Sequence, residues 1–181
     1  MVVVREPGRH TALTRTLHWL TAILVFTMLM VGFIMVNSLE DYARLALVHK
    51  SLGMLIFVVV LVRIVNRLTH RAPALPATVG SIERKLVVAT ELSLYALLVM
   101  QPLVGWAMLS ASGRPVMVFG SVRLPAIAPF SAELFSVLRQ THSLIALALV
   151  VAIAAHVSAV LLHASALRDG MLSRMTYPLS R

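Results

Sequence analysis

Four long apolar stretches, separated by short polar segments, dominate the pattern of the sequence. The first stretch holds 24 residues without a charged side chain, between Arg15 and Glu40. At about 1.5 Å per residue, a helix of this length crosses a hydrocarbon core of about 30 Å. Three similar stretches follow it. We therefore predict a single membrane domain, residues 1–181, folded as an all-α bundle of four transmembrane helices over residues 14–36, 45–67, 84–110 and 137–167.

Residues that interrupt helices lie between these stretches. Pro73 and Pro76 mark a connection after the second stretch, because proline removes a backbone donor and clashes with the preceding turn. The last uncharged stretch, residues 140–167, would be about 42 Å long as a helix and should tilt or extend beyond the bilayer. Before it, we predict an extramembrane loop over residues 110–131, which contain five helix breakers, Gly113, Pro115, Gly120, Pro125 and Pro129.

Composition agrees with a membrane protein and excludes several chemistries. The chain is 59% apolar and 13% charged, with a mean hydropathy of +0.90, whereas soluble domains carry about 25% charged residues. It has no cysteine, which excludes disulfides, thiolate iron–sulfur clusters, cysteine-ligated zinc and covalent C-x-x-C-H haem attachment. The net charge of +9 comes from basic residues that flank apolar stretches. We therefore expect the lipid bilayer as a partner, and no nucleic acid.

The basic residues are unevenly divided between the two sides of the predicted bundle. One side has five, namely Arg44, Lys50, Arg114, Arg123 and Arg139. The other side has eleven: Arg5, Arg9, Arg15, Arg63, Arg67, Arg71, Arg84, Lys85, Arg168, Arg174 and Arg181. Cytoplasmic loops carry the excess of Lys and Arg. This asymmetry predicts a multi-pass membrane protein with both termini in the cytoplasm.

Histidines inside the predicted helices are the candidate functional residues, because ionisable side chains in lipid are costly and usually functional. His142 and His156 are 14 residues apart, which places both rings on nearly one helix face and about 21 Å apart in depth. Small neighbours would leave space for a flat group there, or would simply let helices approach closely. These neighbours are Ala146, Ala148, Ala152, Ala154, Ala155, Ser158 and Ala159.

Each of these two histidines needs a partner at its own depth if it is to share a metal. His49 matches the depth of His142. For His18, depth counting favours His163, but metals at His142 and His163 would then be about 32 Å apart, at opposite membrane surfaces. We therefore pair His18 with His156. Two bis-histidine sites predict two haem b groups, since zinc or copper needs more ligands at one depth. Filled axial positions favour outer-sphere electron transfer.

Several motifs in order along the four helices resemble small bacterial di-haem cytochromes b of the cytochrome b561 type, which include the superoxide oxidases. The resemblance covers nearly the whole chain. It implies that one haem is held by His18 and His156 and the other by His49 and His142. The motifs are Leu17-His18-Trp19-Leu20, Val48-His49-Lys50-Ser51-Leu52-Gly53, Leu94-Tyr95, Gln101-Pro102-Leu103-Val104-Gly105-Trp106, Ser112-Gly113-Arg114-Pro115, Phe119-Gly120, Thr141-His142-Ser143-Leu144, Ala155-His156 and Leu162-His163.

The resemblance also implies a place in the bacterial inner membrane and electron transfer across it, between the periplasmic face and the quinone pool. The superoxide oxidases of this type oxidise superoxide and reduce ubiquinone. Thr16 and His163 correspond to quinone ligands in these relatives, although Thr16 could instead cap its helix. The family commonly has a histidine where this chain has Glu91, which could relay protons or pair with Arg84 or Lys85. Basic residues of the outer face, Lys50, Arg114, Arg123 and Arg139, could attract an anion, or be ordinary interface charges.

Other basic residues have structural interpretations that compete with functional ones. Lys50 and Arg63 can snorkel from the two ends of the second helix. Arg15, Arg67, Lys50 and Arg139 are candidates to bind haem propionates. Two other functions stay open: a cytochrome b subunit that anchors and relays electrons for a separate dehydrogenase or hydrogenase, and a histidine-lined metal or proton carrier without haem.

Overall fold

The computed structural model describes residues 9–70, 73, 80–167 and 172–176, and it contains the four predicted helices. They are α1 (Ala12–Asn37), α2 (Tyr42–Thr69), α3 (Ser81–Ala111) and α4 (Ala132–Leu162). Each is long and apolar enough to span a bilayer. The fold is therefore the predicted four-helix membrane bundle. The proline-containing connection at residues 71–76, apart from Pro73, and the basic residues Arg5, Arg71, Arg168 and Arg181 lie outside the described residues.

Local hydrogen bonds define where the helices begin. The hydroxyl of Thr11 accepts a bond from the backbone N–H of Thr14 at the start of α1, at 3.2 Å. At the start of α4, Ser131 accepts from the backbone N–H of Leu134, also at 3.2 Å. Hydroxyl caps of this kind satisfy N–H groups that have no partner within the helix. The Ser131 cap explains why α4 begins at residue 132, five residues before the predicted boundary.

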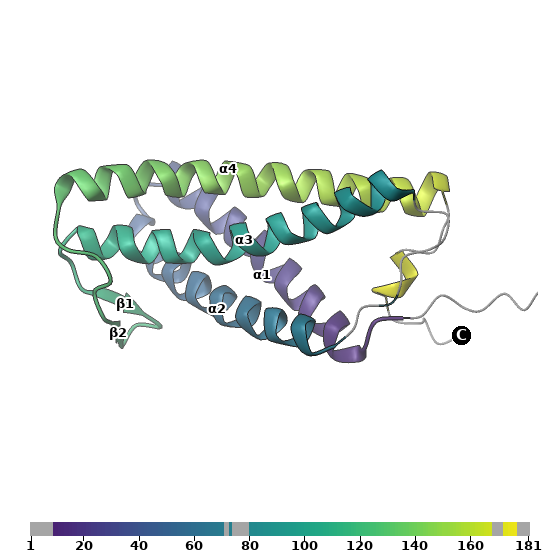
Figure 1. Ribbon diagram of the computed structural model, residues 1–181. Coiled ribbons are helices and arrows are strands. Elements are labelled where there is room, and N and C mark those ends of the chain that lie inside the picture. The colour runs from purple at the N-terminus through teal and green to yellow at the C-terminus, as the bar shows by residue number, and fades with distance from the viewer. Residues whose placement is uncertain (1–8, 71–72, 74–79, 168–171, 177–181) are drawn as a thin grey trace, which may run out of the picture.

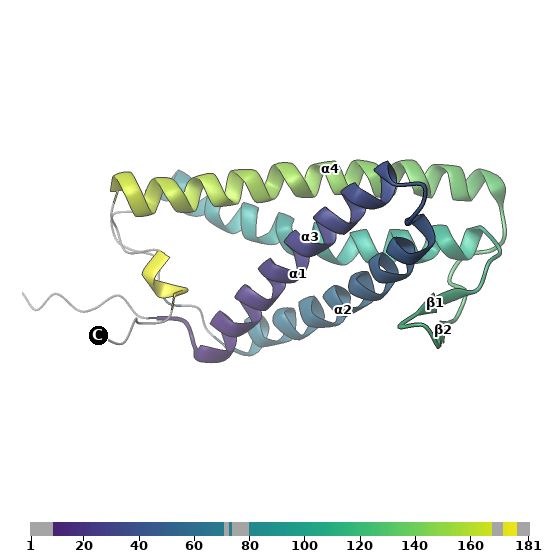
Figure 2. The same ribbon diagram turned by 180° about the vertical axis from the view of Figure 1, so that it is seen from behind.

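The helices associate as two antiparallel pairs (Figures 1 and 2). α1 packs along α2, α3 packs along α4, and contacts between α2 and α3 join the pairs. Neither α1 nor α2 packs along α4 in an extended way. The central core consists of side chains from all four helices, Val25, Ile56, Val60, Leu98 and Leu149, while many large apolar side chains face outwards, as lipid-facing surfaces require.

One end of the bundle, which we call the hairpin end, carries a small β-hairpin that the sequence did not predict (Figure 1). Strands β1 (Val116–Val118) and β2 (Val122–Leu124) pair antiparallel within the predicted extramembrane loop. The hairpin is fixed to the bundle by two bonds. The backbone N–H of Phe119 donates to the Ser51 hydroxyl at 2.7 Å, and Trp106 Nε1 donates to the Pro125 carbonyl at 2.9 Å. Phe119 has a positive φ of 50° at the turn.

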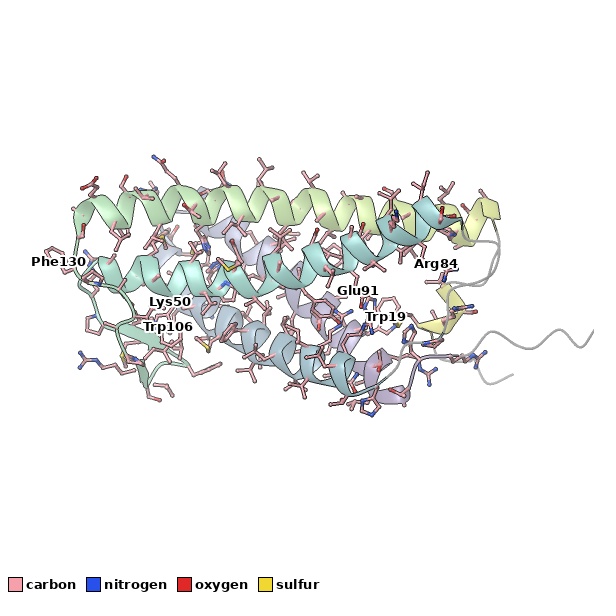
Figure 3. The ribbon with its side chains drawn as sticks, viewed as in Figure 1. Trp19, Lys50, Arg84, Glu91, Trp106 and Phe130 are labelled. Carbon is pink, nitrogen blue, oxygen red and sulfur yellow. The ribbon has the colours of Figure 1, made fainter. Side chains whose placement is uncertain are left out.

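The opposite end, which we call the terminal end, is where α1 begins and α4 finishes. α4 continues into a π-helical turn (His163–Leu167), and a short 3-10 turn follows at Leu172–Arg174. This last segment contacts the start of α1. Trp19 Nε1 donates to the Met175 carbonyl at 2.9 Å, and Arg15 donates to the Thr176 carbonyl at 3.0 Å. Figure 3 shows Trp19 and Glu91 towards this end, and Lys50, Trp106 and Phe130 towards the hairpin end.

Candidate functional site

On each helix, three residues at a seven-residue spacing mark one face, and on every helix except α3 this set includes a candidate histidine ligand. Seven residues are nearly two helical turns, so residues at this spacing share a face. The spacing divides the inner face into three layers. The hairpin-end layer holds Gly32, His49, Gly105 and His142, the middle layer holds Val25, Ile56, Leu98 and Leu149, and the terminal-end layer holds His18, Arg63, Glu91 and His156. The buried core cluster contains all four residues of the middle layer.

The hairpin-end pair consists of His49 from α2 and His142 from α4. Their ring centroids are 6.2 Å apart, with an angle of 70° between the ring planes. The two glycines of this layer face the rings, and only the one at 105 is needed for close approach. A Cβ atom on Gly105 would lie 3.0 Å from His142 Cε1, and one on Gly32 would lie 3.5 Å from His49 Cε1. Glycine at 105 therefore permits the position of the His142 ring.

The terminal-end pair consists of His18 from α1 and His156 from α4. Their ring centroids are 6.4 Å apart, with an interplanar angle of 62°. A charged side chain accompanies this pair, because Arg63 Nη2 lies 3.0 Å from His18 Nδ1. The guanidinium of Arg63 also lies over the ring of Tyr95, 5.2 Å from its centroid. The two histidine pairs thus have different surroundings, one lined by glycine and the other by arginine.

The geometry of both pairs fits a single metal between two axial imidazoles. With metal–nitrogen bonds of about 2 Å and a ring radius of about 1.2 Å, the ring centroids of two axial imidazoles lie about 6 Å apart. Both pairs match this distance. Among the residues that the structure describes, no group of three or more His, Cys, Asp or Glu side chains could hold a metal ion. A donor set of only two histidines fits a metal whose other ligands come from a macrocycle.

At the hairpin end, the described hydrogen bonds leave the ring nitrogens open to a metal, except that Nε2 of His142 would have to give up one contact with Gln101. Nδ1 of His49 and Nδ1 of His142 are buried and have no hydrogen-bond partner. His142 Nε2 accepts from the side-chain amide of Gln101 at 3.2 Å. Buried polar nitrogens normally have partners, and exceptions call for an explanation. The helices that carry each histidine pair, α1 with α4 and α2 with α4, do not pack along each other, so a flat group could lie between them. The residues present therefore fit haem.

The structure places Thr16 and His163 in different surroundings. The Thr16 hydroxyl donates to the Ala12 carbonyl at 3.0 Å, so it does not cap α1, a role that belongs to Thr11. Thr16 lines a mostly apolar hollow of about 640 Å³, together with Trp19, Leu20, Ile23 and Thr176. His163 is not part of this hollow. It is 7% exposed, and its Nε2 lies 3.1 Å from Glu83 Oε1 on α3.

Glu91 pairs with a basic residue other than the two expected. Its carboxylate accepts bonds from Arg67 of α2 at 2.9 and 3.4 Å, whereas the sequence suggested Arg84 or Lys85 on its own helix. Both side chains are more than a third exposed. The neighbouring His10 is held below its ordinary pKa of 6.5, chiefly by burial; Arg174 also lowers its pKa, and Glu91 partly offsets the shift.

A second hollow, of about 480 Å³, lies beside the hairpin. Arg114 and Arg123 line it, together with apolar side chains that include Pro125 and Phe130. Figure 3 shows Phe130 at this end of the bundle. Lys50 lies on α2 directly after His49. The hairpin end therefore combines basic side chains with a recess in the loop that follows α3.

Comparison with known proteins identifies the family. The sequence profile described as prokaryotic cytochrome b561 matches residues 9–178. The chain belongs to this family. Cytochrome b561 homolog 2 of Escherichia coli strain K12 is 31% identical over 129 residues, which are 70% of this chain and 69% of that protein. Proteins of the family are membrane cytochromes that bind haem b, usually two, and transfer electrons. This chain is accordingly a multi-pass membrane b-type cytochrome.

Sequence reasoning missed two features of the site that this cytochrome shows. Arg63 was interpreted as a snorkelling anchor, whereas it contacts His18. The glycines at 32 and 105 were not connected with the histidines they face. The signal was present in the seven-residue spacing, which extends from the histidines to Gly32, Arg63 and Gly105 on the neighbouring helices.

Proposed function

We propose that the terminal-end pair, His18 and His156, and the hairpin-end pair, His49 and His142, are the axial ligands of two haem b groups. The support is the separation of the ring centroids, 6.4 and 6.2 Å, together with the two-histidine donor sets. A bis-histidine haem supplies a reversible one-electron couple with no open coordination position. The protein residues hold the rings in place and exclude water from them.

We propose next that electrons cross the membrane along α4. His142 and His156 are on one helix, 14 residues or about 21 Å apart along its axis. The hairpin end then serves as the periplasmic side, and the terminal end as the cytoplasmic side, of the inner membrane. The support for this orientation is the excess of Lys and Arg at the terminal end.

Superoxide is the proposed donor and ubiquinone the proposed acceptor. Two superoxide anions lose one electron each and leave as dioxygen, and one ubiquinone takes up two electrons and two protons. Support at the hairpin end comes from Arg114 and Arg123, which line a recess where an anion gains favourable electrostatic energy. We assign ubiquinone to the hollow beside Thr16 and Trp19, whose apolar lining suits a quinone ring. His163 lies outside this hollow, paired with Glu83, and is proposed as a second quinone-binding or proton-delivering group at the same end of the bundle.

The ligand assignment is tested by replacing the histidines one at a time in the purified protein. His18→Ala and His156→Ala should each remove the same haem, and His49→Ala and His142→Ala should each remove the other. His163→Ala is the matched control and should retain both haems. Haem content and reduced-minus-oxidised spectra provide the measurement. Loss of a haem in His163→Ala with retention in His156→Ala would show that the terminal-end pair is wrong.

The donor and acceptor are tested separately, with purified protein, a superoxide-generating system and ubiquinone. The protein should reduce ubiquinone only while superoxide is supplied, and Thr16→Val should slow this reaction without changing haem content. An alternative function is electron relay for a separate dehydrogenase or hydrogenase subunit. Exposed aromatic side chains beside the hairpin, Phe119 at 56% and Phe130 at 78%, could contact such a subunit. A haem-loaded protein that is inert to superoxide would favour this alternative.

A further inference from the structure

Arg63 occupies an unusual position among the described charged residues of the bundle. It lies in the terminal-end layer, six residues before the end of α2, and is partly buried. Among the described residues, the carboxylates in ion pairs are Glu91, which binds Arg67, and Glu83, which binds His163. Arg63 thus contacts His18 and the face of Tyr95 but is in no ion pair with a described carboxylate.

The contact between Arg63 and His18 is incompatible with the usual coordination of a metal by His18. A guanidinium can only donate hydrogen bonds, so Nδ1 of His18 must be the acceptor in this contact. In a neutral imidazole the other nitrogen, Nε2, then carries the proton. A histidine that binds a metal through Nε2 carries its proton on Nδ1 instead and donates it to an acceptor. Two donors would then face each other, and the guanidinium of Arg63 must turn away.

A carboxylate is the partner that Arg63 needs when it turns away. A guanidinium presents a planar set of donors that matches a carboxylate with two parallel bonds. Haem b carries two propionate carboxylates at one edge, and they enter the bundle together with the metal. The face of Tyr95 restricts the guanidinium to one side, because the two groups already stack at 5.2 Å. The hairpin-end layer has glycine at the two positions that are not histidine, so it has no counterpart of Arg63.

We propose that Arg63 binds a propionate of the haem held by the terminal-end pair. This proposal rests on the proposed ligation by His18 and His156. Arg15 of α1 and Arg67 of α2 were the candidates that the sequence suggested for this role. We assign it to Arg63 instead, because Arg67 binds Glu91 and Arg15 binds the Thr176 carbonyl. By neutralising the carboxylate, Arg63 favours the ferrous state of this haem, because an uncompensated negative charge nearby stabilises ferric iron.

The test compares Arg63→Gln with a matched control one turn along α2. The control, Arg67→Gln combined with Glu91→Gln, removes the adjacent ion pair and leaves the net charge unchanged. Midpoint potentials of both haems are measured by redox titration, and the propionate carboxylate bands by redox-difference infrared spectroscopy with ¹³C-labelled propionates. Arg63→Gln should lower the midpoint potential of one haem and shift its carboxylate band towards that of a free propionate. The control should change neither.

A second measurement separates contact with the propionate from contact with His18. Wild type and Arg63→Gln are each reconstituted with haem dimethyl ester, whose propionates carry no charge. Arg63→Gln should weaken binding of native haem at the terminal-end pair more than binding of the ester, because only native haem offers Arg63 a carboxylate. An equal loss of affinity for native and esterified haem would overturn the proposal, because Arg63 would then act through His18 or the iron itself.

Arg63→Lys keeps the test decisive if Arg63→Gln fails to retain the terminal-end haem. It should retain the haem and its potential better than Arg63→Gln, but with an altered carboxylate band, since an ammonium cannot form the paired bonds. An unaltered band in Arg63→Lys would overturn the proposal. Failure of the ligation itself is distinguishable, because the terminal-end haem would then survive His18→Ala.

Discussion

Gly105→Ala should selectively weaken binding of the haem at the hairpin end. The new Cβ would lie 3.0 Å from His142 Cε1 and 3.3 Å from His142 Nδ1. Carbon atoms normally approach to about 3.5–4.0 Å, so the His142 ring would have to retreat by about 0.5 Å. Overpacking of this kind costs about 1–3 kcal/mol. If the cost falls on the bound state, haem binds about 5- to 150-fold more weakly, at about 1.4 kcal/mol per tenfold change.

The intrinsic helix preference of alanine does not cancel this effect. Alanine stabilises a helix interior by about 1 kcal/mol relative to glycine, but it does so whether or not haem is bound. The assay is the rate of haem transfer from the purified protein to excess apomyoglobin, together with the haem content of each site from reduced-minus-oxidised spectra. Gly105→Ala should release one haem faster, while the other haem keeps its wild-type rate.

Two other glycines provide matched controls for the same substitution. A Cβ on Gly32 would meet the His49 ring at 3.5 Å, and one on Gly53 would meet only Met28, also at 3.5 Å. Both distances are ordinary contacts, so Gly32→Ala and Gly53→Ala should retain haem as wild type does. The steric argument is refuted if Gly105→Ala releases haem at the wild-type rate, or if either control releases it faster than Gly105→Ala.

Three further predictions concern the ends of the bundle. Glu91→Gln should cost no more than about 1 kcal/mol of stability, because its partner Arg67 is well exposed; a collapse of electron transfer in this variant, measured with haem content intact, would instead indicate a proton relay. Because the pKa of His10 is lowered in the folded protein, the unfolded chain binds a proton at His10 more readily than the folded protein does. Protonation therefore favours unfolding, so the contribution of neutral His10 to stability is complete above pH 6.5 and is lost as the pH falls below that value. Thermal unfolding between pH 5 and 7 (a range of about 2 units around the ordinary histidine pKa) should show this slope in the wild type and a weaker slope in His10→Gln. Ser131→Ala should destabilise α4 by about 1 kcal/mol through loss of its cap, whereas unchanged denaturant unfolding would show that the cap contributes nothing.

The sequence predicts the helices well because the relevant signal is local. A run of residues without charge must cross the bilayer as a helix, and this holds whatever its neighbours are. Helix rise paired His18 with His156 rather than His163, because metals at His142 and His163 would be about 32 Å apart, at opposite membrane surfaces. The structure brings the first two rings together and places His163 against Glu83 instead.

Lateral contacts between helices were not predictable in the same way. The rotation and tilt of each helix decide which side chains meet, and a single sequence does not specify them. Glu91 therefore reaches Arg67 on α2 rather than a residue of its own helix, and Arg63 faces His18. The β-hairpin was missed for another reason. Each strand has only three residues, too few for an alternating pattern to stand out among glycines and prolines.

The middle layer of the bundle lies between the two histidine pairs, on the proposed path of the electrons. Val25, Ile56, Leu98 and Leu149 meet there, each seven residues from a histidine of its helix or, for Leu98, from Gly105. Partly buried side chains that pack against this cluster include Leu24, Ile153 and Tyr95, and the hydroxyl of Thr21, which is buried one turn before Val25, donates to the Leu17 carbonyl. Hydrated protons need a chain of water or ionisable groups to move, and the four side chains of the middle layer supply no such group, whereas an electron can tunnel through hydrocarbon. If electrons cross the bundle as proposed, a redox couple would be discharged across the membrane without a matching path for protons through these four side chains.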